Sequence, residues 1–391
     1  MDITIYPQKL NGAVRAIPSK SQAHRLLICA AFADAPTTLF CPDTNRDIEA
    51  TADCLRALGA EVSRNETGYA VAPVRQFPPF ATLNCGESGS TLRFMLPIAG
   101  ALGVDATFLM EGRLPYRPLS PLWEEMERMG CVLSRPSENT VRCQGKLQSG
   151  NYTIDGSISS QFITGLLFAL SLLDKESELT VTGRVESRPY IEMTQQAMSL
   201  FGISCKPLGG QTFHSPSFVT VEGDWSNGAF WLAAKSLGSE LTIENLSLDS
   251  KQGDKAVVSL LEQLSAGCPS INVADIPDLV PILAIPAGMK HGAVFTNIQR
   301  LRLKESDRVA TVIAMIRALG GSAEATESTL TVQSVPFRGG CVDSAGDHRI
   351  AMAAAIAATV CTKPVTILNA EAVNKSYPGF WTEYRRLGGI I

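Results

Sequence analysis

Apolar and polar positions follow a pattern that recurs along the 391-residue chain. Six times, an amphipathic segment that suits a helix ends in glycine and gives way to residues that favour β-strands. We expect each glycine to follow the last helical residue, where a left-handed residue ends a helix. The six segments are RALGAEV at Gly59, ERMGCVL at Gly130, SLFGISC at Gly202, QLSAGCPSI at Gly267, RALGGSAE at Gly320 and RRLGGII at Gly388.

The spacing of these glycines indicates a structural repeat. They follow one another at intervals of 71, 72, 65, 53 and 68 residues, which is too regular for six unrelated helix ends. Each interval is long enough for two strands, two helices and a closing hairpin. The pattern therefore predicts an α/β protein in which helices pack on sheets, with three repeated units in each of two globular domains.

Composition limits the possible classes of protein. A chain with 45% hydrophobic and 18% charged residues can bury a full core, and its net charge of −4 argues against a general nucleic-acid binder. Ten scattered cysteines without a C-x-x-C pair indicate reduced core residues of a cytosolic protein, with neither a disulfide framework nor a zinc site. The start MDITIYPQKL shows no leader pattern, and no apolar run suits a membrane span, so we expect a cytoplasmic protein.

The predicted helix starts combine hydroxyl groups, small residues and cations. The helix that begins near Ser19 carries Lys20 and Arg25 early, although a helix N-terminus already has a partial positive charge. A lone serine there is an ordinary N-cap, but a cap needs no cation, so the recurrence indicates anion sites. Without a P-loop or G-x-G-x-x-G motif, small phosphorylated metabolites suit these sites better than nucleotides. The other starts are GESGSTLRF, DGSISSQF, SRPYIEM, RLRLKESDR and GDHRIAM.

Nine short motifs carry a resemblance to a known family. They are, in order, PSKSQAHR, GESGSTLR, YRP, DGSISSQF, SRPY, IPD, LKESDR, GDHR and NKSYPGF. In order and spacing the chain resembles the shikimate-pathway enolpyruvyl transferases, the family of 5-enolpyruvylshikimate-3-phosphate synthases, over nearly its whole length. The resemblance implies two globules of the inside-out α/β barrel type that hinge around a central cleft. It assigns residues 1–18 with 225–391 to the C-terminal globule and 19–224 to the N-terminal one.

The same resemblance implies a reaction. The enolpyruvyl group of phosphoenolpyruvate is transferred to the 5-hydroxyl of shikimate 3-phosphate through a tetrahedral intermediate, and phosphate is released. It implies no metal ion, no cofactor and no nucleic-acid or membrane partner, a monomeric state, and relatives on which the herbicide glyphosate acts. Addition to the double bond requires a base for the hydroxyl and an acid for C3.

Four residues resemble the family's proton-transfer groups. Asp278 matches the residue that accepts the hydroxyl proton, and Glu305 the residue that protonates C3 and later removes a proton. Lys20 and Lys375 match lysines that hold phosphoenolpyruvate and shuttle protons. The residues alone favour Asp278 as an acid in a first helical turn after Pro277, and they leave Glu305 open as a surface ion-pair partner of Lys304 or Arg308.

Further residues match the family's substrate-binding positions. For phosphoenolpyruvate they are Lys20, Gly89, Arg117, Gln161, Arg308, Arg349 and Lys375. For shikimate 3-phosphate they are Ser21, Arg25, Ser159, Ser160, Gln161, Ser187, Tyr190, Asp278 and Lys304. We expect Asp47 to order a loop beside the hinge. Glu87 and Arg300 stand where relatives carry asparagine, and we expect Glu87 to pair with an arginine or lysine because a carboxylate opposes anion binding.

Three other functions fit the sequence less well. The related transferase that acts on a UDP-sugar has a reactive cysteine in the loop before its R-P arginine, whereas this chain has GRLPYRP there. A cyclase that acts on RNA termini needs a nucleotide-binding histidine arrangement, and only four histidines are present in an acidic chain. A non-catalytic repeat scaffold would spread varied polar residues along one face instead of gathering cations at helix starts.

Overall fold

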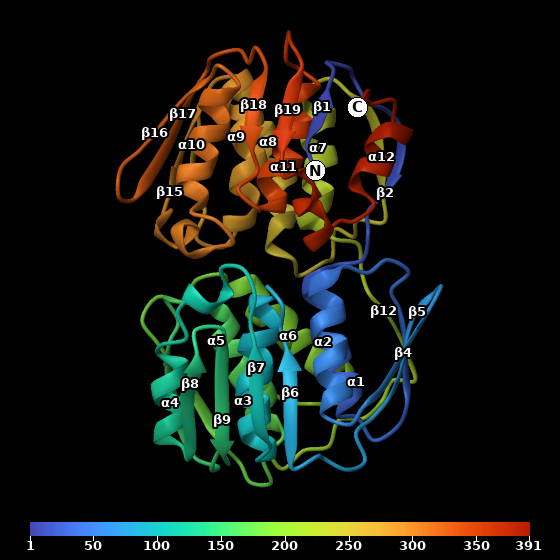
Figure 1. Cartoon of the computed structure of the whole chain (residues 1–391), viewed down its shortest axis with the longest axis vertical. Helices are drawn as coiled ribbons and strands as arrows, with labels where there is room; N and C mark the ends of the chain where they lie inside the picture. Colours follow the sequence, from blue (N-terminus) through green and yellow to red (C-terminus); the bar gives the residue numbers. More distant parts are fainter. The chain divides into compact units, whose positions relative to one another are not determined.

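The computed structural model describes all 391 residues and divides into two compact units (Figure 1). The N-terminal unit comprises Pro18–Val221, and the C-terminal unit comprises Met1–Ile17 with Glu222–Ile391. The boundaries expected from the sequence lie one and three residues further along the chain. Each unit combines helices with sheets, so the predicted α/β class is confirmed. None of the helices has the length and apolar composition that a membrane span requires.

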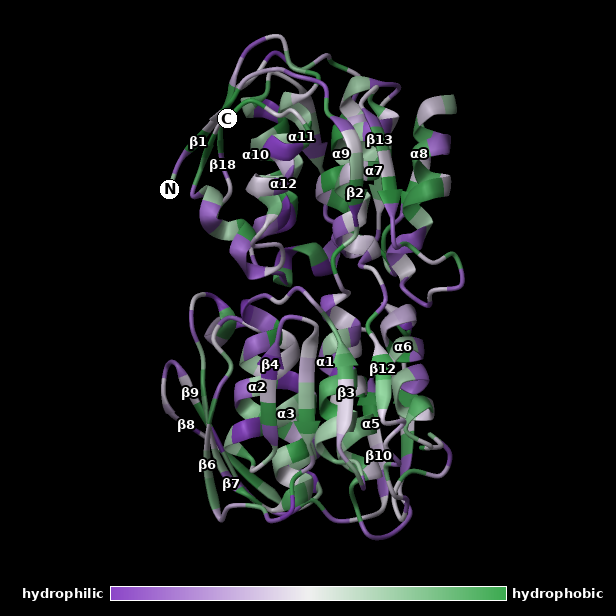
Figure 2. Cartoon of the chain, turned by 90° about the vertical axis from the view of Figure 1, so that its right-hand side faces the viewer, coloured by the Kyte–Doolittle hydropathy of each residue, from purple (hydrophilic) through white to green (hydrophobic).

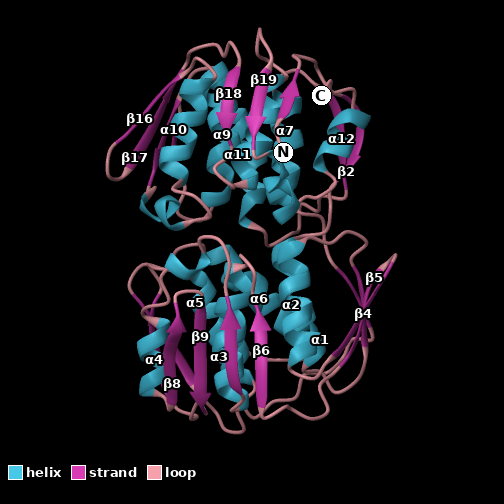
Figure 3. Ribbon diagram, in the orientation of Figure 1, coloured by secondary structure: helices cyan, strands magenta, loops and turns pink.

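The N-terminal unit contains three separate sheets. The first has the order β12-β3-β5-β4, the second β6-β7-β9-β8, and the third consists of the parallel pair β10-β11. Their bounds are β3 Thr37–Phe40, β4 Glu61–Asn65, β5 Gly68–Ala72, β6 Phe80–Asn84, β7 Asp105–Leu109, β8 Cys131–Ser137, β9 Thr140–Gly145, β10 Asn151–Asp155, β11 Glu178–Thr182 and β12 Phe218–Thr220. Figure 3 shows β6, β7 and β9 in front of the helices of this unit, and β4 and β5 at its flank.

The helices of the N-terminal unit are of two kinds. Nearly every residue of α1, α3 and α5 is buried, whereas α2, α4 and α6 each keep an exposed face. The two inner helices α3 and α5 pack directly against each other, and α6 packs against α1 and α5. The bounds are α1 Lys20–Ala31, α2 Arg46–Ala57, α3 Gly89–Leu102, the 3-10 turn η1 Leu114–Tyr116, α4 Leu122–Arg128, α5 Ser160–Ser171 and α6 Arg188–Leu200.

The C-terminal unit also has three sheets, and both N-terminal strands belong to them. Strand β1 pairs antiparallel with β19, and β2 pairs parallel with β13. The sheet orders are β1-β19-β18, β13-β2 and β14-β15-β17-β16. The bounds are β1 Ile3–Ile5, β2 Asn11–Arg15, β13 Glu240–Glu244, β14 Ser270–Asn272, β15 Ala293–Thr296, β16 Ser322–Ala325, β17 Thr329–Gln333, β18 Gly340–Asp343 and β19 Val365–Leu368.

The helices of the C-terminal unit are also of two kinds, buried and partly exposed. Helices α7, α9 and α11 are buried along most of their length, whereas α8, α10 and α12 keep exposed residues. In Figure 2 hydrophobic residues are concentrated in the helices and strands, and hydrophilic residues in the loops. The bounds are α7 Trp225–Ser236, η2 Gly253–Ala256, α8 Val257–Ala266, η3 Pro277–Leu279, α9 Val280–Met289, η4 Gln299–Leu303, α10 Arg308–Ala318, α11 His348–Ala358, η5 Ala370–Lys375 and α12 Phe380–Arg386.

Five of the six repeat glycines end helices as predicted. Gly59, Gly130, Gly202, Gly320 and Gly388 all have positive φ, between 75° and 108°. The prediction is wrong at Gly267, where φ is 177° and the backbone is extended. Its N–H donates to the carbonyl of Gln263, as in a continuing helix, and the chain then runs straight into β14. No left-handed turn is needed at that helix end.

The ten cysteines are all free thiols. Seven are buried, as expected for core residues, and Cys205 is partly exposed. The expectation is wrong for Cys268 and Cys341, which are exposed. Cys341 lies on the outward face of the short strand β18, and Cys268 lies in the segment between α8 and β14, so neither side chain reaches the core.

Candidate active site

The predicted helix starts are helix N-termini in the structure. Serine caps begin three helices of the N-terminal unit: Ser19 for α1, Ser88 for α3 and Ser159 for α5. Each hydroxyl oxygen accepts a hydrogen bond from a backbone N–H two or three residues later. In the C-terminal unit, Asp307 and Asp347 cap α10 and α11 in the same way. The local sequence therefore leaves N–H groups of the first turns directed at the space in front of each helix.

Lys20 and Arg25, the two cations early in α1, are held by different partners. The Lys20 ammonium donates to Asp47 at 2.8 Å, and Asp47 lies in the first turn of α2. Asp47 therefore positions Lys20. Arg25 is buried, and its guanidinium donates to the carbonyls of Ser21 and Tyr190 and to the hydroxyl of Thr194. Arg25 thereby ties α1 to α6, and burial lowers its pKa to about 10, which leaves it charged at neutral pH.

Two further guanidinium groups meet at the N-terminus of α3. A Cβ atom built on Gly89 would lie 2.6 Å from Nη1 of Arg117 and 2.9 Å from Nη1 of Arg93. Glycine is therefore required for both arginines to approach the first turn this closely. Two cations beside the N-terminus of a helix are an arrangement that suits an anion.

Gln161 links this site to α5. Its side-chain oxygen accepts from Arg93 at 2.7 Å, and its side-chain nitrogen donates to Ser90 at 3.0 Å. Ser159 and Ser160 precede it at the start of α5 and are both buried. The structure thus brings the predicted residues of α3 and α5 together.

Ser187 and Tyr190 lie at the start of α6. Ser187 is buried and has φ 54° and ψ 40°, a left-handed conformation that is unusual for serine. Such backbone strain is found preferentially at functional positions. The Tyr190 carbonyl accepts from Arg25, which joins this helix start to the cations of α1.

A buried chain of hydrogen bonds connects the first three helices. His24 Nδ1 bonds to the Thr51 hydroxyl at 2.7 Å, Thr51 bonds to Thr91 at 2.7 Å, and Thr91 donates to the Ser88 cap at 2.8 Å. All four side chains are fully buried. Burial lowers the pKa of His24 to about 3, so the imidazole is neutral and adds no charge beside the cations. No local sequence pattern predicts the first two of these bonds, because the partners lie 27 and 40 residues apart.

In the C-terminal unit, Arg308 binds three carboxylates. Its guanidinium lies 2.5 Å from Asp278, 2.7 Å from Glu305 and 2.8 Å from Asp347. The side chain of Arg308 is only 1% exposed, so these contacts are shielded from water. Burial lowers the pKa of Arg308, but the three carboxylates outweigh it and raise that pKa well above its usual value.

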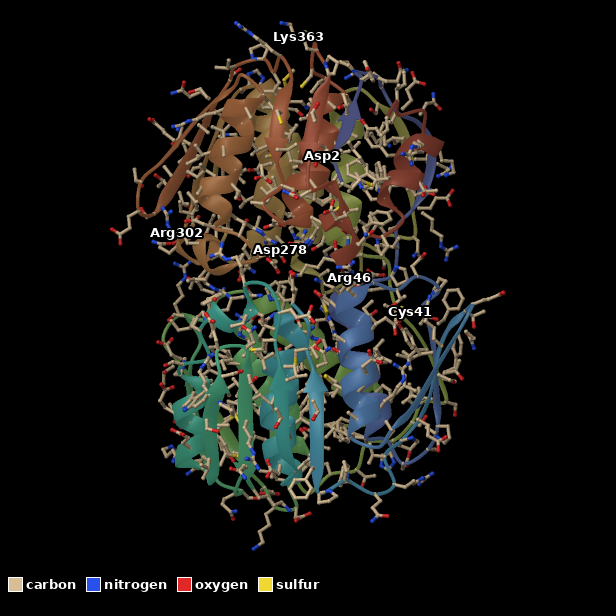
Figure 4. The ribbon with its side chains drawn as sticks, in the orientation of Figure 1. Asp2, Cys41, Arg46, Asp278, Arg302 and Lys363 are labelled. Carbon is tan, nitrogen blue, oxygen red and sulfur yellow. The ribbon has the colours of Figure 1, made fainter.

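Asp278 is surrounded by further cations. Besides Arg308, Lys304 lies 3.6 Å from one carboxylate oxygen and Arg349 lies 3.5 Å from the other. Burial raises the pKa of Asp278, but Arg349, Lys304 and Arg308 together hold it well below its ordinary range. Figure 4 labels Asp278 at the end of this unit where loops enter the helices, with Lys363 at the opposite end. The predicted residues Asp278, Lys304, Glu305, Arg308 and Arg349 thus form one cluster.

Lys304 differs from an ordinary surface lysine. Burial, together with the charges of Arg308 and Arg300, lowers its pKa to about 8, although the Asp278 charge opposes the shift. Arg300, whose role the sequence left open, therefore adds positive charge close to Lys304. The side-chain nitrogen of Lys304 loses its proton at a pH well below that of a free lysine.

The remaining predicted residues have less distinctive surroundings. Lys375 is the last residue of the 3-10 turn η5 and does not lie at a helix N-terminus. Its side chain is buried. The Glu87 carboxylate lies against Gly112, where an added Cβ would meet it at 2.7 Å. An ion pair of Glu87 with an arginine or lysine stays a prediction.

Two residues of the site were absent from the sequence-based assignment. Arg93 follows Gly89 by four positions, which places both on one face of α3. That spacing could have indicated the arginine. Asp347 was recognised only as part of a helix start, and nothing local shows that its carboxylate binds Arg308 thirty-nine residues earlier.

Comparisons with known proteins show which family this chain is similar to. Residues 5–269 and 267–384 match the profile of the family described as EPSP synthase (3-phosphoshikimate 1-carboxyvinyltransferase). The chain is 36% identical over 417 aligned residues to the 3-phosphoshikimate 1-carboxyvinyltransferase of Clostridium kluyveri, covering 100% of this chain and 98% of that protein. It is 36% identical over 427 residues to the protein of the same name from Clostridium beijerinckii, again with 100% and 98% coverage.

Solved structures show the same fold. An EPSP synthase structure from Acinetobacter baumannii superposes with a TM-score of 0.80 at 21% identity, covering 99% of this chain and 98% of that one. The enolpyruvyl transferase NikO from Streptomyces tendae superposes with a TM-score of 0.76 at 17% identity, with 99% and 97% coverage.

Proposed function

Since the chain belongs to the EPSP synthase family, we propose that its two sets of site residues bind phosphoenolpyruvate and shikimate 3-phosphate and carry the proton transfers between them. The protein transfers the enolpyruvyl group of phosphoenolpyruvate to shikimate 3-phosphate in the shikimate pathway, on the route to aromatic amino acids. The roles of individual residues are the proposal.

Phosphoenolpyruvate carries a phosphate and a carboxylate, so it needs several cations. Planar guanidinium groups bind both anions in a bidentate manner. Arg117 beside Gly89, with Gln161 and Lys20, supplies such a site in the N-terminal unit. Arg308, Arg349 and Lys375 supply the cations from the C-terminal unit.

Shikimate 3-phosphate binds at the starts of α1, α5 and α6. Backbone N–H groups and hydroxyls at helix N-termini suit its phosphate. Ser159, Ser160 and Ser187 with Lys304 bind that phosphate. Ser21, Arg25, Gln161 and Tyr190 contact the ring, its hydroxyls and its carboxylate.

The cluster around Arg308 carries the proton transfers. Asp278 accepts the proton of the 5-hydroxyl as that oxygen bonds to C2, and Glu305 gives a proton to C3. In the elimination Glu305 takes a proton back from C3, the bond from C2 to the phosphate oxygen breaks, and the proton held by Asp278 leaves with the phosphate.

Arg308, Arg349 and Lys304 keep Asp278 ionised, and the same three cations bind the anionic groups of the substrates. When a substrate anion binds Arg308, it competes with Glu305 for the guanidinium. Glu305 is then released from its ion pair and can take up the proton that it gives to C3. Lys20 and Lys375 assist from beside phosphoenolpyruvate.

One observation supports this assignment above the others. A single buried guanidinium holds Asp278 and Glu305 at 2.5 and 2.7 Å, so two carboxylates with different predicted roles lie at one cationic centre. An acid and a base held close together suit an addition followed by an elimination.

Phosphate release tests the function directly. The purified protein should release phosphate only when phosphoenolpyruvate and shikimate 3-phosphate are both present, in equal amount with the enolpyruvyl product. Release from phosphoenolpyruvate alone would indicate a phosphatase and would overturn the proposal.

Replacing Arg117 with alanine should raise the KM for phosphoenolpyruvate at least tenfold. A charge-assisted hydrogen bond contributes roughly 1.5–3 kcal/mol, and Arg117 is not assigned to the other substrate. Steady-state kinetics against each substrate would check this. Arg113→Ala, an exposed arginine of the same loop, is the matched control. Equal weakening of both substrates would count against the assignment.

The affinity for shikimate 3-phosphate should depend on pH through Lys304. Because its pKa lies at about 8, the lysine is charged at pH 7 and mostly neutral at pH 9. The Kd should therefore rise about tenfold from pH 7 to pH 9. Titration calorimetry should show proton uptake on binding at pH 9, and Lys304→Met should abolish both effects. The same pH dependence in that variant would exclude Lys304 as the cause.

We also propose that the protein is a cytoplasmic monomer. Ten free cysteines suit a reducing compartment, and two exposed thiols would be prone to oxidation elsewhere. Light scattering coupled to gel filtration would test the monomer, and a mass near 84 kDa, about twice that of the 41.9 kDa chain, would contradict it.

A further inference from the structure

Asp254 is a buried carboxyl group outside the set of residues assigned above. It lies in η2 and is 2% exposed. One of its oxygens, Oδ2, accepts a hydrogen bond from the Ser226 hydroxyl in the first turn of α7. The other oxygen, Oδ1, is buried without any hydrogen-bond partner. An ionised carboxylate with an unsatisfied buried oxygen is costly, so this group needs an explanation.

The segment that carries Asp254 is fixed to the start of α7. The Gln252 side chain accepts from the backbone N–H of Trp225 at 3.0 Å and donates to the carbonyl of Gly223 at 2.8 Å. The neighbouring Lys255 points elsewhere, because its ammonium donates to the carbonyls of Leu248 and Ser250. The carboxyl of Asp254 therefore has a defined position.

Two of the charged groups around Asp254 belong to the active-site cluster. The carboxylate of Asp278 in η3 and that of Asp224 at the start of α7 repel its charge, whereas Arg349 in α11 attracts it. Burial and the Asp278 charge raise the pKa of Asp254 to about 7, although Arg349 and the Ser226 hydroxyl oppose the shift. Both η2 and η3 pack against α7, which brings the two carboxyl groups into the same region.

We propose that Asp254 is a positioning residue whose charge controls how readily Asp278 accepts the hydroxyl proton of the substrate. This inference rests on the proposed function of Asp278. When Asp254 is ionised, its charge repels that of Asp278 and makes Asp278 a stronger base. When Asp254 carries a proton, that repulsion is absent and the cations around Asp278 dominate. The proton of Asp254 stays on Asp254 throughout the reaction.

The test is the pH profile of kcat/KM for shikimate 3-phosphate at saturating phosphoenolpyruvate. The wild-type profile should rise with an inflection near pH 7 and fall again as Lys304 loses its proton. Asp254→Asn should lose the rise and keep the fall. Wild-type Asp254 is mainly ionised at pH 7.5. At that pH the kcat/KM of the Asp254→Asn variant should lie about tenfold below the wild-type value. A wild-type profile and rate in Asp254→Asn would overturn the proposal.

Ser226→Ala provides an independent variant that keeps the carboxyl group. Loss of the hydroxyl removes a hydrogen bond to the ionised form, so the rising limb should move to higher pH. A purely structural role of Asp254 would not move this limb, and an unmoved limb would also contradict the proposal. Asp278→Asn separates the two hypotheses. If that variant stays fully active, the proposed function of Asp278 fails; if it is inactive while Asp254→Asn retains the wild-type profile, only this inference fails.

Discussion

Replacing Glu305 with glutamine is expected to lower kcat on the order of 10²–10⁴-fold, the usual range for a general acid–base group. Glutamine keeps the shape of the side chain and can still accept a hydrogen bond from Arg308, which lies 2.7 Å away. It cannot give a proton to C3 or remove one. The loss should therefore appear in kcat, whereas the Kd for shikimate 3-phosphate should change little.

Two further variants serve as the control and the comparison for Glu305→Gln. Glu324→Gln, an exposed glutamate of β16, removes an equal charge from the same unit and should leave kcat unchanged. Asp278→Asn should lower kcat and also weaken shikimate 3-phosphate, because its carboxylate holds the reacting hydroxyl. If Glu305→Gln weakens shikimate 3-phosphate as strongly as Asp278→Asn does, the separation of roles between the two carboxylates is wrong.

Replacing Arg308 with methionine is expected to have the largest effect on stability. The change leaves Asp278, Glu305 and Asp347 close together without their common cation. Removing one partner of a buried ion pair typically costs about 3–5 kcal/mol, and here three carboxylates lose the same partner. Urea unfolding at pH 7 should show a loss of at least that size, and enzyme activity should be lost with it.

The pH dependence of the stability of Arg308→Met distinguishes repulsion between the unpaired carboxylates from a packing defect. Without Arg308 the carboxylates hold protons more tightly in the folded state than in the unfolded one, so the stability of the variant should increase as the pH falls from 7 to 5. A packing defect would give the same loss at both values. Arg302→Met, a partly exposed arginine of the preceding turn, should change the free energy of unfolding by about 1 kcal/mol or less.

Local sequence patterns predicted the ends of the helices well. Ser19, Ser88 and Ser159 are N-caps because a hydroxyl beside a helix start finds an unbonded N–H within three residues. Gly59 and four others end helices because only glycine takes the left-handed conformation without cost. Such signals act over a few residues, so they can be read from the chain without knowing the fold. Gly267 shows their limit, since a glycine permits a left-handed turn but does not impose one.

Contacts between distant segments could not be predicted in this way. Nothing near Arg308 shows that Asp347 and Asp278 become its partners. Nothing near Asp254 shows that the Ser226 hydroxyl binds it or that the Asp278 charge acts on it. These contacts depend on which helix starts meet in the folded unit. Their electrostatic consequences, such as the lowered pKa of Lys304, follow from burial and so require the structure as well.

Solvent deuterium exchange at C3 of phosphoenolpyruvate tests the division of proton transfers most directly. Exchange requires a proton to be given to C3 and taken back, whether or not product is formed. In deuterium oxide with both substrates, the wild-type protein should incorporate deuterium into recovered phosphoenolpyruvate, and Glu305→Gln should do so at least about a hundredfold more slowly. Exchange at a near wild-type rate in Glu305→Gln would contradict the assignment and indicate that Lys20 or Lys375 is the acid at C3.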